Sequence, residues 1–169
     1  RVISSDNHIY EPPDLWTSRI ESRYTDRSPQ LKTFDTGGFQ VGAGQLWVCD
    51  DRTSQAIGQG SNSGKRFDDP DSVRNMGFFE EVRPGGYLPE EYVKDLDLDG
   101  VDVGIIYPSV GFLLYQNVRD SLLFDAVCRV YNDWLAEFCS YDPKRLVGVA
   151  MINLDDAQVG LKEIERCAK

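Results

Sequence analysis

The sequence contains a single histidine, His8, among 169 residues. Serine and cysteine nucleophiles are activated by a histidine base that a third group orients, so one histidine supports no Ser/His/Asp or Cys/His set. A catalytic zinc ion takes about three protein ligands and keeps an open position. The chain is therefore expected to supply only part of any zinc site, with the remaining ligands lying elsewhere.

Positive charge and long apolar runs are also scarce. Lys and Arg number 18 against 28 Asp and Glu, which gives a net charge of −10 at pH 7. Nucleic acids and anionic membrane surfaces attract basic proteins, so this charge argues against both as partners. No run approaches the roughly 20 apolar residues of a membrane span, and the β-prone opening is not a signal peptide. We expect an acidic, soluble, cytoplasmic protein.

Two common site motifs are missing. The 4 cysteines include no CxxC pair, and we expect buried free thiols instead of a disulfide framework. Gly64-Lys65 suggests a phosphate-binding loop, but Gly58 lies one residue too far back and Arg66 stands where Ser or Thr is needed. The sequence therefore predicts neither a cysteine-based metal site nor a P-loop.

The length is that of one domain, with an irregular first half and a regular second half. Residues 15–86 show little helical periodicity. Within them, residues 39–41 and 46–49 flank Gly-Ala-Gly at 42–44, which predicts a small β-hairpin. Residues 58–65 have the composition of a flexible loop. No internal repeat is visible.

The second half alternates strands and helices. Its predicted elements are helix 89–99, strand 101–107, helix 120–140, strand 146–154 and a helix from about 157, which Asp155 or Asp156 caps. Apolar residues follow the helical period in the last two helices. They are Leu123, Val127, Val130, Trp134 and Phe138 in one, and Ala157, Leu161, Ile164 and Ala168 in the other.

This alternation predicts an α/β fold with a parallel sheet of three βα units, the first strand lying at residues 2–5. Catalytic groups of such folds lie at the carboxyl ends of the strands. Asp6 and His8 follow the first strand, Tyr107 and Ser109 the second, and Asn153 the third.

Asp6 and His8 are separated by one residue, so in a strand their side chains project to the same face. A carboxylate and an imidazole so placed can reach one divalent ion, with bonds of roughly 2.0–2.2 Å for zinc. A hydrogen-bonded histidine without a metal explains the pair equally well.

Residues 3–16, ISSDNHIYEPPDLW, resemble the opening of the amidohydrolase-related metal-dependent hydrolases. This family includes aromatic-acid decarboxylases related to aminocarboxymuconate semialdehyde decarboxylase and resorcylate decarboxylase. Many members begin with an acidic residue or histidine, one spacer and a histidine at the end of the first barrel strand. One large subgroup continues with Glu-Pro-Pro-x-Leu-Trp, as this chain does. The resemblance continues in residues 97–103, 107–108, 132–139 and 142–148.

The resemblance implies a (β/α)8 TIM barrel, of which residues 1–169 would be the N-terminal portion with its first three βα units. The chain opens abruptly on a strand and ends inside a helical pattern, so both ends look cut. Residues 35–86 would be an irregular insertion that forms a lid or a subunit contact. The expected partners are a small-molecule substrate, the remainder of the same barrel and further copies in a homo-oligomer.

For the site, the resemblance implies that Asp6 and His8 bind one divalent ion, Zn²⁺ or alternatively Mn²⁺. The family's later ligands, a histidine and an aspartate, and its acid/base histidine would lie beyond this chain, so its catalytic residues are unknown. Tyr107, Ser109 and Asn153 are expected to line the substrate site. Glu11 either supports that site or faces the substrate, unless it is a solvated loop residue.

The expected activity is hydrolysis or non-oxidative decarboxylation of a small aromatic or cyclic carboxylate or amide, because the first half of the metal site serves both reactions. One alternative is a non-catalytic α/β fragment that serves as a binding or assembly module. A flavodoxin-like domain is a weaker alternative, because no glycine-rich phosphate loop follows the first strand.

Overall fold

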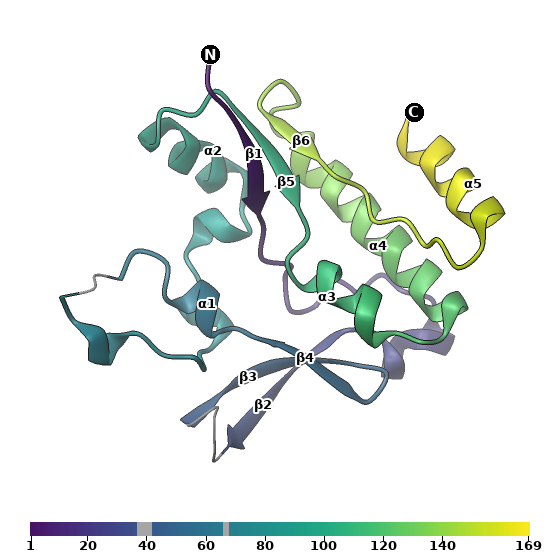
Figure 1. The fold of residues 1–169 in the computed structure, drawn as a ribbon, viewed down its shortest axis with the longest axis horizontal. Helices are drawn as coiled ribbons and strands as arrows, with labels where there is room; N and C mark the ends of the chain where they lie inside the picture. Colours follow the sequence, from purple (N-terminus) through teal and green to yellow (C-terminus); the bar gives the residue numbers. More distant parts are fainter. Residues whose placement is uncertain (37–41, 66–67) are drawn as a thin grey trace.

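A computed structural model describes residues 1–36, 42–65 and 68–169. Its central feature is a three-stranded parallel sheet in the order β1-β5-β6, formed by β1 (Ile3–His8), β5 (Val103–Tyr107) and β6 (Leu146–Gly148). The strands lie side by side in Figure 1, with their carboxyl ends at the same edge. The predicted α/β fold with a parallel sheet is confirmed.

A β-bulge interrupts the pairing of β1 with β5. Ser4 pairs with Gly104 and Asn7 with Ile106, so β1 carries one extra residue between these pairs. The bulge lets Ser4 and Asn7, three residues apart, meet on one side, where the Ser4 Oγ lies 3.1 Å from the Asn7 Oδ1. Beyond the bulge, His8 pairs with Tyr107 at the carboxyl end of the sheet.

One face of this sheet is covered by α2 (Pro89–Leu98) and α4 (Ser121–Cys139). The predicted apolar stripe of α4 is buried in full, each member being at most 9% exposed: Leu123, Val127, Val130, Trp134 and Phe138. It packs in one core with Ile106 of β5 and Leu146 of β6. Burying a large aliphatic side chain contributes about 1.5–3 kcal/mol, so this stripe fixes α4 on the sheet.

Two predictions for the second half need correction. The third strand ends at Gly148 and not at Leu154. The N–H groups of Met151 and Ile152 bind the Asn132 Oδ1 (2.7 Å) and the Tyr115 hydroxyl (2.8 Å), so these side chains replace a neighbouring strand. An additional helix, α3 (Val110–Asn117), follows β5. Its sequence, VGFLLYQN, is apolar almost throughout and gives no helical periodicity.

The first half contains a second, antiparallel sheet in the order β2-β3-β4. Its strands are β2 (Gln30–Thr36), β3 (Gly42–Cys49) and β4 (Arg52–Ala56). The loop predicted at 58–65 begins with the short helix α1 (Gly58–Ser61). Short 3-10 helices complete the region: η1 (Ser22–Arg27), η2 (Pro70–Ser72), η3 (Phe79–Glu81) and η4 (Pro84–Gly86).

The predicted hairpin turn at residues 42–44 is wrong. These residues belong to β3, where Gly42 pairs with Thr36 and Gly44 with Phe34. Gly44 is needed for close packing, because a Cβ there would lie 2.8 Å from the Cβ of Met76. Residues 39–41, the first arm of the predicted hairpin, lie outside the described residues. The turn that joins β3 to β4 is Asp50-Asp51, both at positive φ (52° and 59°).

Trp16 packs between the second sheet and α4, the helix that lies on the central sheet. Its ring meets Trp47 of β3 edge to face, with 5.4 Å between centroids, and its indole N–H donates to the Val127 carbonyl of α4 (3.1 Å). Trp16 and Trp47 are at most 1% exposed. Residues of both sheets therefore belong to one buried core, which includes Trp47 of β3 and Ile106 of β5.

The last helix, α5 (Ala157–Cys167), starts at Asp156, whose carboxylate accepts from the N–H groups of Gln158 and Val159. None of the helices in residues 1–36, 42–65 and 68–169 has the length and apolar character that crossing a bilayer requires. All four cysteines are free, as predicted. Cys49 and Cys128 are buried, Cys139 is half-buried, and Cys167 is exposed, contrary to the prediction of burial.

Candidate metal and substrate site

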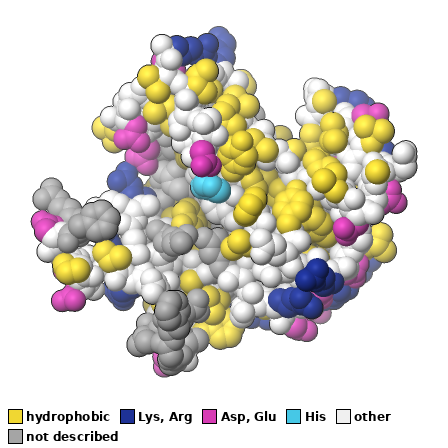
Figure 2. All heavy atoms as spheres, viewed as in Figure 1, with side chains coloured by type: hydrophobic (Ala, Val, Ile, Leu, Met, Phe, Trp, Pro, Cys, Tyr) yellow, Lys and Arg dark blue, Asp and Glu magenta, His cyan; other side chains and the backbone are white. Residues whose placement is uncertain are grey.

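Asp6 and His8 lie together at the carboxyl end of β1. The His8 Nε2 is 3.5 Å from the Asp6 Oδ1, and the side chains are 52% and 81% exposed for His8 and Asp6. Figure 2 shows the imidazole at the centre of one face of the molecule, directly beside an acidic side chain. The two groups predicted to project together therefore do converge, at an accessible position.

The other imidazole nitrogen is held by the backbone that follows β5. The His8 Nδ1 lies 3.0 Å from the Pro108 carbonyl oxygen and 3.4 Å from the Ser109 hydroxyl. A carbonyl oxygen only accepts, so this contact favours the proton of the neutral ring on Nδ1; the Asp6 carboxylate, which also only accepts, lies farther from its nitrogen, at 3.5 Å. The lone pair is then on Nε2, the nitrogen that faces Asp6.

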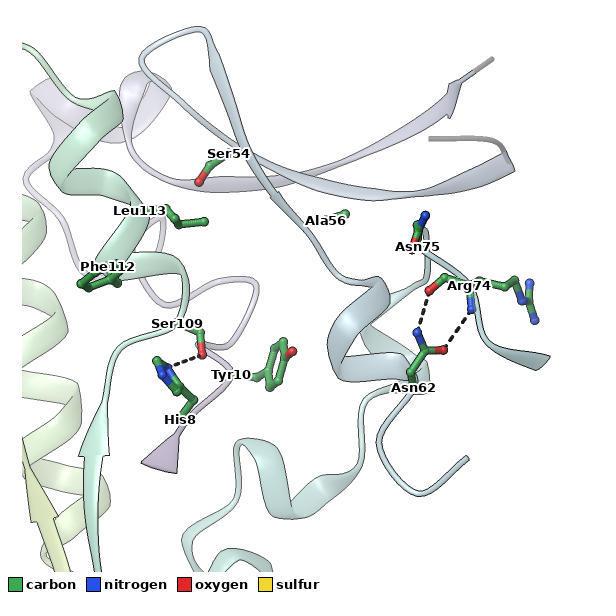
Figure 3. A pocket seen from close by; sticks show the side chains of 10 residues that line it. All are labelled: His8, Tyr10, Ser54, Ala56, Asn62, Arg74, Asn75, Ser109, Phe112 and Leu113. Atoms are coloured by element: carbon green, nitrogen blue, oxygen red, sulfur yellow. Dashed lines mark hydrogen bonds between the residues drawn. The ribbon is translucent and has the colours of Figure 1, made fainter. Parts of the chain in front are cut away.

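A cleft of about 680 Å³ opens beside His8. It lies between the end of the parallel sheet and the residues around β4 and α1, as Figure 3 shows. One wall consists of His8, Tyr10, Ser109, Phe112 and Leu113, and the other of Ser54, Ala56, Asn62, Arg74 and Asn75.

The far wall of the cleft is organised by its own hydrogen bonds. Asn62 accepts from the Arg74 backbone N–H (3.1 Å) and donates to the Arg74 carbonyl (2.7 Å). The Arg74 guanidinium points away from His8 in Figure 3 and pairs with Glu81 at 3.7 Å. This wall therefore presents mainly neutral polar groups to the cleft.

Glu11 lies beneath the start of α3, and of the three positions that the sequence left open the structure excludes two. It is 1% exposed, which contradicts both a solvated loop residue and a carboxylate open to substrate. Its two oxygens accept from the N–H groups of Ser109 (3.0 Å), Val110 (3.1 Å) and Gly111 (3.0 Å). Burial raises the pKa of Glu11 above its usual value, while these backbone bonds favour the charged form.

Asn153 is also displaced from its predicted role. It is 2% exposed, its amide N–H donates to the carbonyl (2.9 Å) and hydroxyl (3.1 Å) of Ser121, and its oxygen accepts from Asp155 N–H. Asn153 thus ties the start of α4 to the turn before α5 and does not line the cleft.

The remaining predicted lining residues stay near His8. Ser109 lines the cleft, and the half-buried Tyr107 lies with its ring centroid 6.3 Å from that of His8. Sequence reasoning missed Tyr10, although it continues the two-residue spacing of Asp6 and His8. It also missed the far wall, because residues 54–75 reach the cleft only through tertiary packing and carry no sequence signal for it.

The ligand types present suit a divalent ion, since carboxylate oxygen and imidazole nitrogen bind zinc and manganese. Among the described residues, no three His, Cys, Asp or Glu side chains gather closely enough to hold a metal ion. Asp6 and His8 therefore fit part of a metal site, and at least one further ligand would have to come from outside the described residues.

Comparison with known proteins gives matches to larger enzymes. No family model matches the chain. It is 25% identical over 91 residues to a 2-amino-3-carboxymuconate-6-semialdehyde decarboxylase of Dictyostelium discoideum, covering 53% of this chain and 24% of that protein. It is 29% identical over 82 residues to a γ-resorcylate decarboxylase of Polaromonas sp. (strain JS666 / ATCC BAA-500), covering 48% and 24%. The chain spans about a quarter of the length of these curated relatives.

Solved structures share the fold over almost the whole chain. An amidohydrolase from Mycobacterium avium subsp. paratuberculosis K-10 superposes with a TM-score of 0.71 at 20% identity, over 99% of this chain and 46% of that one. The apo form of the Metarhizium anisopliae IDCase gives 0.53 at 16% identity, over 98% and 38%. Sequence and fold therefore point the same way: the chain is similar in sequence to two decarboxylases and in fold to an amidohydrolase, over part of the length of each.

Proposed function

We propose that this chain forms the first three βα units of a (β/α)8 barrel enzyme that holds one divalent metal ion, with Asp6 and His8 as two of its ligands. The observation that carries the proposal is the convergence of these side chains, 3.5 Å apart, at the carboxyl end of β1. Barrel enzymes place their active sites at that end of the strands. The order β1-β5-β6 agrees with three consecutive barrel strands.

Exposed apolar side chains support a continuing barrel. On the sheet face opposite α2 and α4, Ile3 is 57% and Val147 42% exposed, and Leu154 beyond β6 is 74% exposed. Figure 2 shows hydrophobic side chains beside His8 on this face. In a closed barrel the inward-pointing side chains pack in layers, so further strands would cover this face.

The substrate we propose is a small aromatic or cyclic carboxylate or amide. Tyr10 and Phe112 supply aromatic surface, and the Ser109 hydroxyl and the Asn62 and Asn75 amides supply neutral hydrogen-bonding groups to the same cleft. A flat ring with polar substituents matches this mixture. The two curated relatives are named as decarboxylases, one of γ-resorcylate, an aromatic carboxylate, and one of 2-amino-3-carboxymuconate-6-semialdehyde, an open-chain one.

The metal would supply a bound water of lowered pKa and would polarise a carbonyl or carboxylate. The residues of this chain would bind the ion and orient the substrate. Asp6 and His8 would fix the ion at the mouth of the cleft, Ser109 lies within reach of a substrate oxygen, and the ring of Tyr10 shields the site from one side. The acid/base group would come from outside this chain.

The test is metal content of the full-length protein after dialysis, measured by mass spectrometry. We expect about one zinc or manganese ion per chain, and its loss in Asp6→Ala and His8→Ala. Asp26→Ala is the control, because Asp26 is exposed and lies outside the cleft lining. Unchanged metal content in the first two variants would refute the ligand assignment. A wild-type protein that retains no metal would refute the metal site and favour the alternative, a non-catalytic binding or assembly module.

The product then distinguishes non-oxidative decarboxylation from hydrolysis. A panel of aromatic 2-hydroxy acids is supplied to the full-length enzyme and carbon dioxide is measured. Release of carbon dioxide supports non-oxidative decarboxylation. No release across the panel, with turnover of cyclic amides, supports hydrolysis by the metal-bound water.

A further inference from the structure

Glu11 is a buried carboxylate that replaces a helix cap. Ser109 precedes α3, but its side chain makes no capping hydrogen bond. The Glu11 Oε1 accepts from the N–H groups of Ser109 and Gly111 (both 3.0 Å), and the Oε2 accepts from Val110 (3.1 Å). Burying an ionised group is expensive unless it is hydrogen-bonded, and helix N-terminal N–H groups satisfy a carboxylate well.

One peptide group connects Glu11 to His8. The N–H of Ser109 donates to Glu11, and the carbonyl of the same peptide, that of Pro108, lies 3.0 Å from the His8 Nδ1. A trans peptide is planar, and its N–H and C=O point in opposite directions. Fixing the N–H on Glu11 therefore fixes the carbonyl on the imidazole.

This carbonyl selects the imidazole tautomer. A carbonyl accepts only, so it stabilises the form with the proton on Nδ1 and the lone pair on Nε2. The Asp6 carboxylate also only accepts and favours a proton on Nε2, but it lies 3.5 Å away against 3.0 Å for the carbonyl. The second group near Nδ1, the Ser109 hydroxyl at 3.4 Å, both donates and accepts and so selects neither form. If the peptide turned away, the Asp6 carboxylate would be the remaining acceptor-only group beside the ring, and the proton would move to Nε2.

The turn is also held from its other side. A Cβ at position 111 would lie 2.4 Å from the Met151 Sδ and 2.9 Å from the Pro108 Cβ, so only glycine lets the turn sit this close. The backbone of Met151 is in turn bound at both its N–H (2.7 Å) and its carbonyl (2.8 Å) by the Asn132 amide. The turn therefore packs tightly against Met151, and the hydrogen bonds of Glu11 set the direction of the Pro108–Ser109 peptide.

We propose that Glu11 is a positioning residue, which acts through the Pro108–Ser109 peptide to keep the His8 Nε2 unprotonated and aimed at Asp6. The consequence for metal binding rests on the function proposed above, whereas the tautomer does not. Groups that orient a metal-binding histidine typically change metal affinity by about 10–100-fold when they are removed.

The experiment is a two-bond ¹⁵N–¹H correlation spectrum of the imidazole, at a pH where the ring is neutral, without metal. The His8 signals are assigned by their loss in His8→Gln. We expect the Nδ1–H pattern in the wild type and a shift toward the Nε2–H pattern in Glu11→Gln. Asp156→Asn is the matched control, because Asp156 caps α5 in the same way without contacting His8.

Two results would overturn the proposal. The first is an Nε2–H pattern in the wild type, which needs no variant and so stands even if Glu11→Gln does not fold. The second is an unchanged pattern in a Glu11→Gln protein whose far-ultraviolet circular dichroism is that of the wild type. Zinc titration then separates the two proposals. A wild type that binds no zinc removes the proposed metal site but leaves the tautomer result intact, and a 10–100-fold weaker zinc affinity in Glu11→Gln supports both.

Discussion

Helices α4 and α5 carry similar apolar stripes but use them differently. On α4 the stripe is buried, with Leu123 and Val127 at 0% exposure, whereas Leu161 and Ile164 of α5 are 48% and 49% exposed. In Figure 1, α4 lies against the parallel sheet and α5 stands at the margin of the molecule. The period of a sequence therefore predicts a helix and its apolar face, but not what covers that face.

Polar side chains dock α5 on α4 in place of apolar ones. The Asn132 amide donates to the Glu163 Oε1 (2.8 Å), and Arg166 binds both Glu163 (2.7 Å) and Asp133. Glu163 is 5% exposed although it is charged. The face of α5 that the sequence marks as polar is thus the one turned inward. Such a contact orients a helix, and it leaves the apolar face available to another element.

The largest expected difference between the two helices comes from matched leucine deletions. Leu123→Ala should lower the free energy of unfolding by about 2–5 kcal/mol, because it empties a filled core position. Leu161→Ala should change it by no more than about 0.5 kcal/mol, since half of that side chain already meets water. Urea unfolding of the 169-residue chain measures both. Equal losses would show that the exposed stripe of α5 is covered.

The polar contact between the helices should have an intermediate effect. Glu163→Gln removes the charge that Asn132 and Arg166 bind, and should lower the free energy of unfolding by about 1–3 kcal/mol at pH 7. Glu165→Gln, an exposed position two residues along α5, is the control and should leave stability unchanged. Similar values for the two variants would mean that the buried ion pair contributes no net stability.

Glu163 also makes the free energy of unfolding depend on pH, and its surroundings fix the direction. Burial alone would raise the pKa of Glu163, but hydrogen bonds from Arg166 and Asn132 outweigh it and hold the pKa below its usual value. A depressed pKa in the folded state means that this stabilisation is present above about pH 4.5, the ordinary value, and is lost as pH falls through the folded-state pKa. Glu163→Gln should therefore show a shallower loss of stability in acid than the wild type.

The sequence was informative where a structure depends on local pattern. Periodicity predicted the parallel sheet, α2 and α4, and two-residue spacing predicted the convergence of Asp6 with His8. For the cap of α5 the residue types left Asp155 and Asp156 open, and the structure selects Asp156. The hydrogen-bond partners of Glu11 and Asn153 could not be found this way. Glu11 binds backbone 98–100 residues further along the chain, and such a contact leaves no mark in the spacing of neighbouring residues.

Two glycines led to a wrong turn prediction for a related reason. Gly42 and Gly44 suggested a turn, yet they lie in β3, and Gly44 is small because Met76 packs against it. The turn that joins β3 to β4, Asp50-Asp51, uses residues that tolerate a positive φ less readily than glycine. One residue type therefore serves turns and close contacts alike, and only the tertiary structure separates the two uses.

The smallest expected effect concerns the thiols of the two helices. Cys128 of α4 is 0% exposed, and burial raises its pKa. Cys167 of α5 is exposed, and desolvation raises its pKa too, although it remains open to reagents. Alkylation of the native chain, followed by peptide mass spectrometry, should therefore label Cys167 well before Cys128, while in urea all four cysteines should react alike. Burial of the α4 stripe should keep Cys128 from the reagent. Equal rates of labelling in the native chain would therefore mean that α4 opens as readily as α5, and the contrast between a core helix and a marginal one would fail.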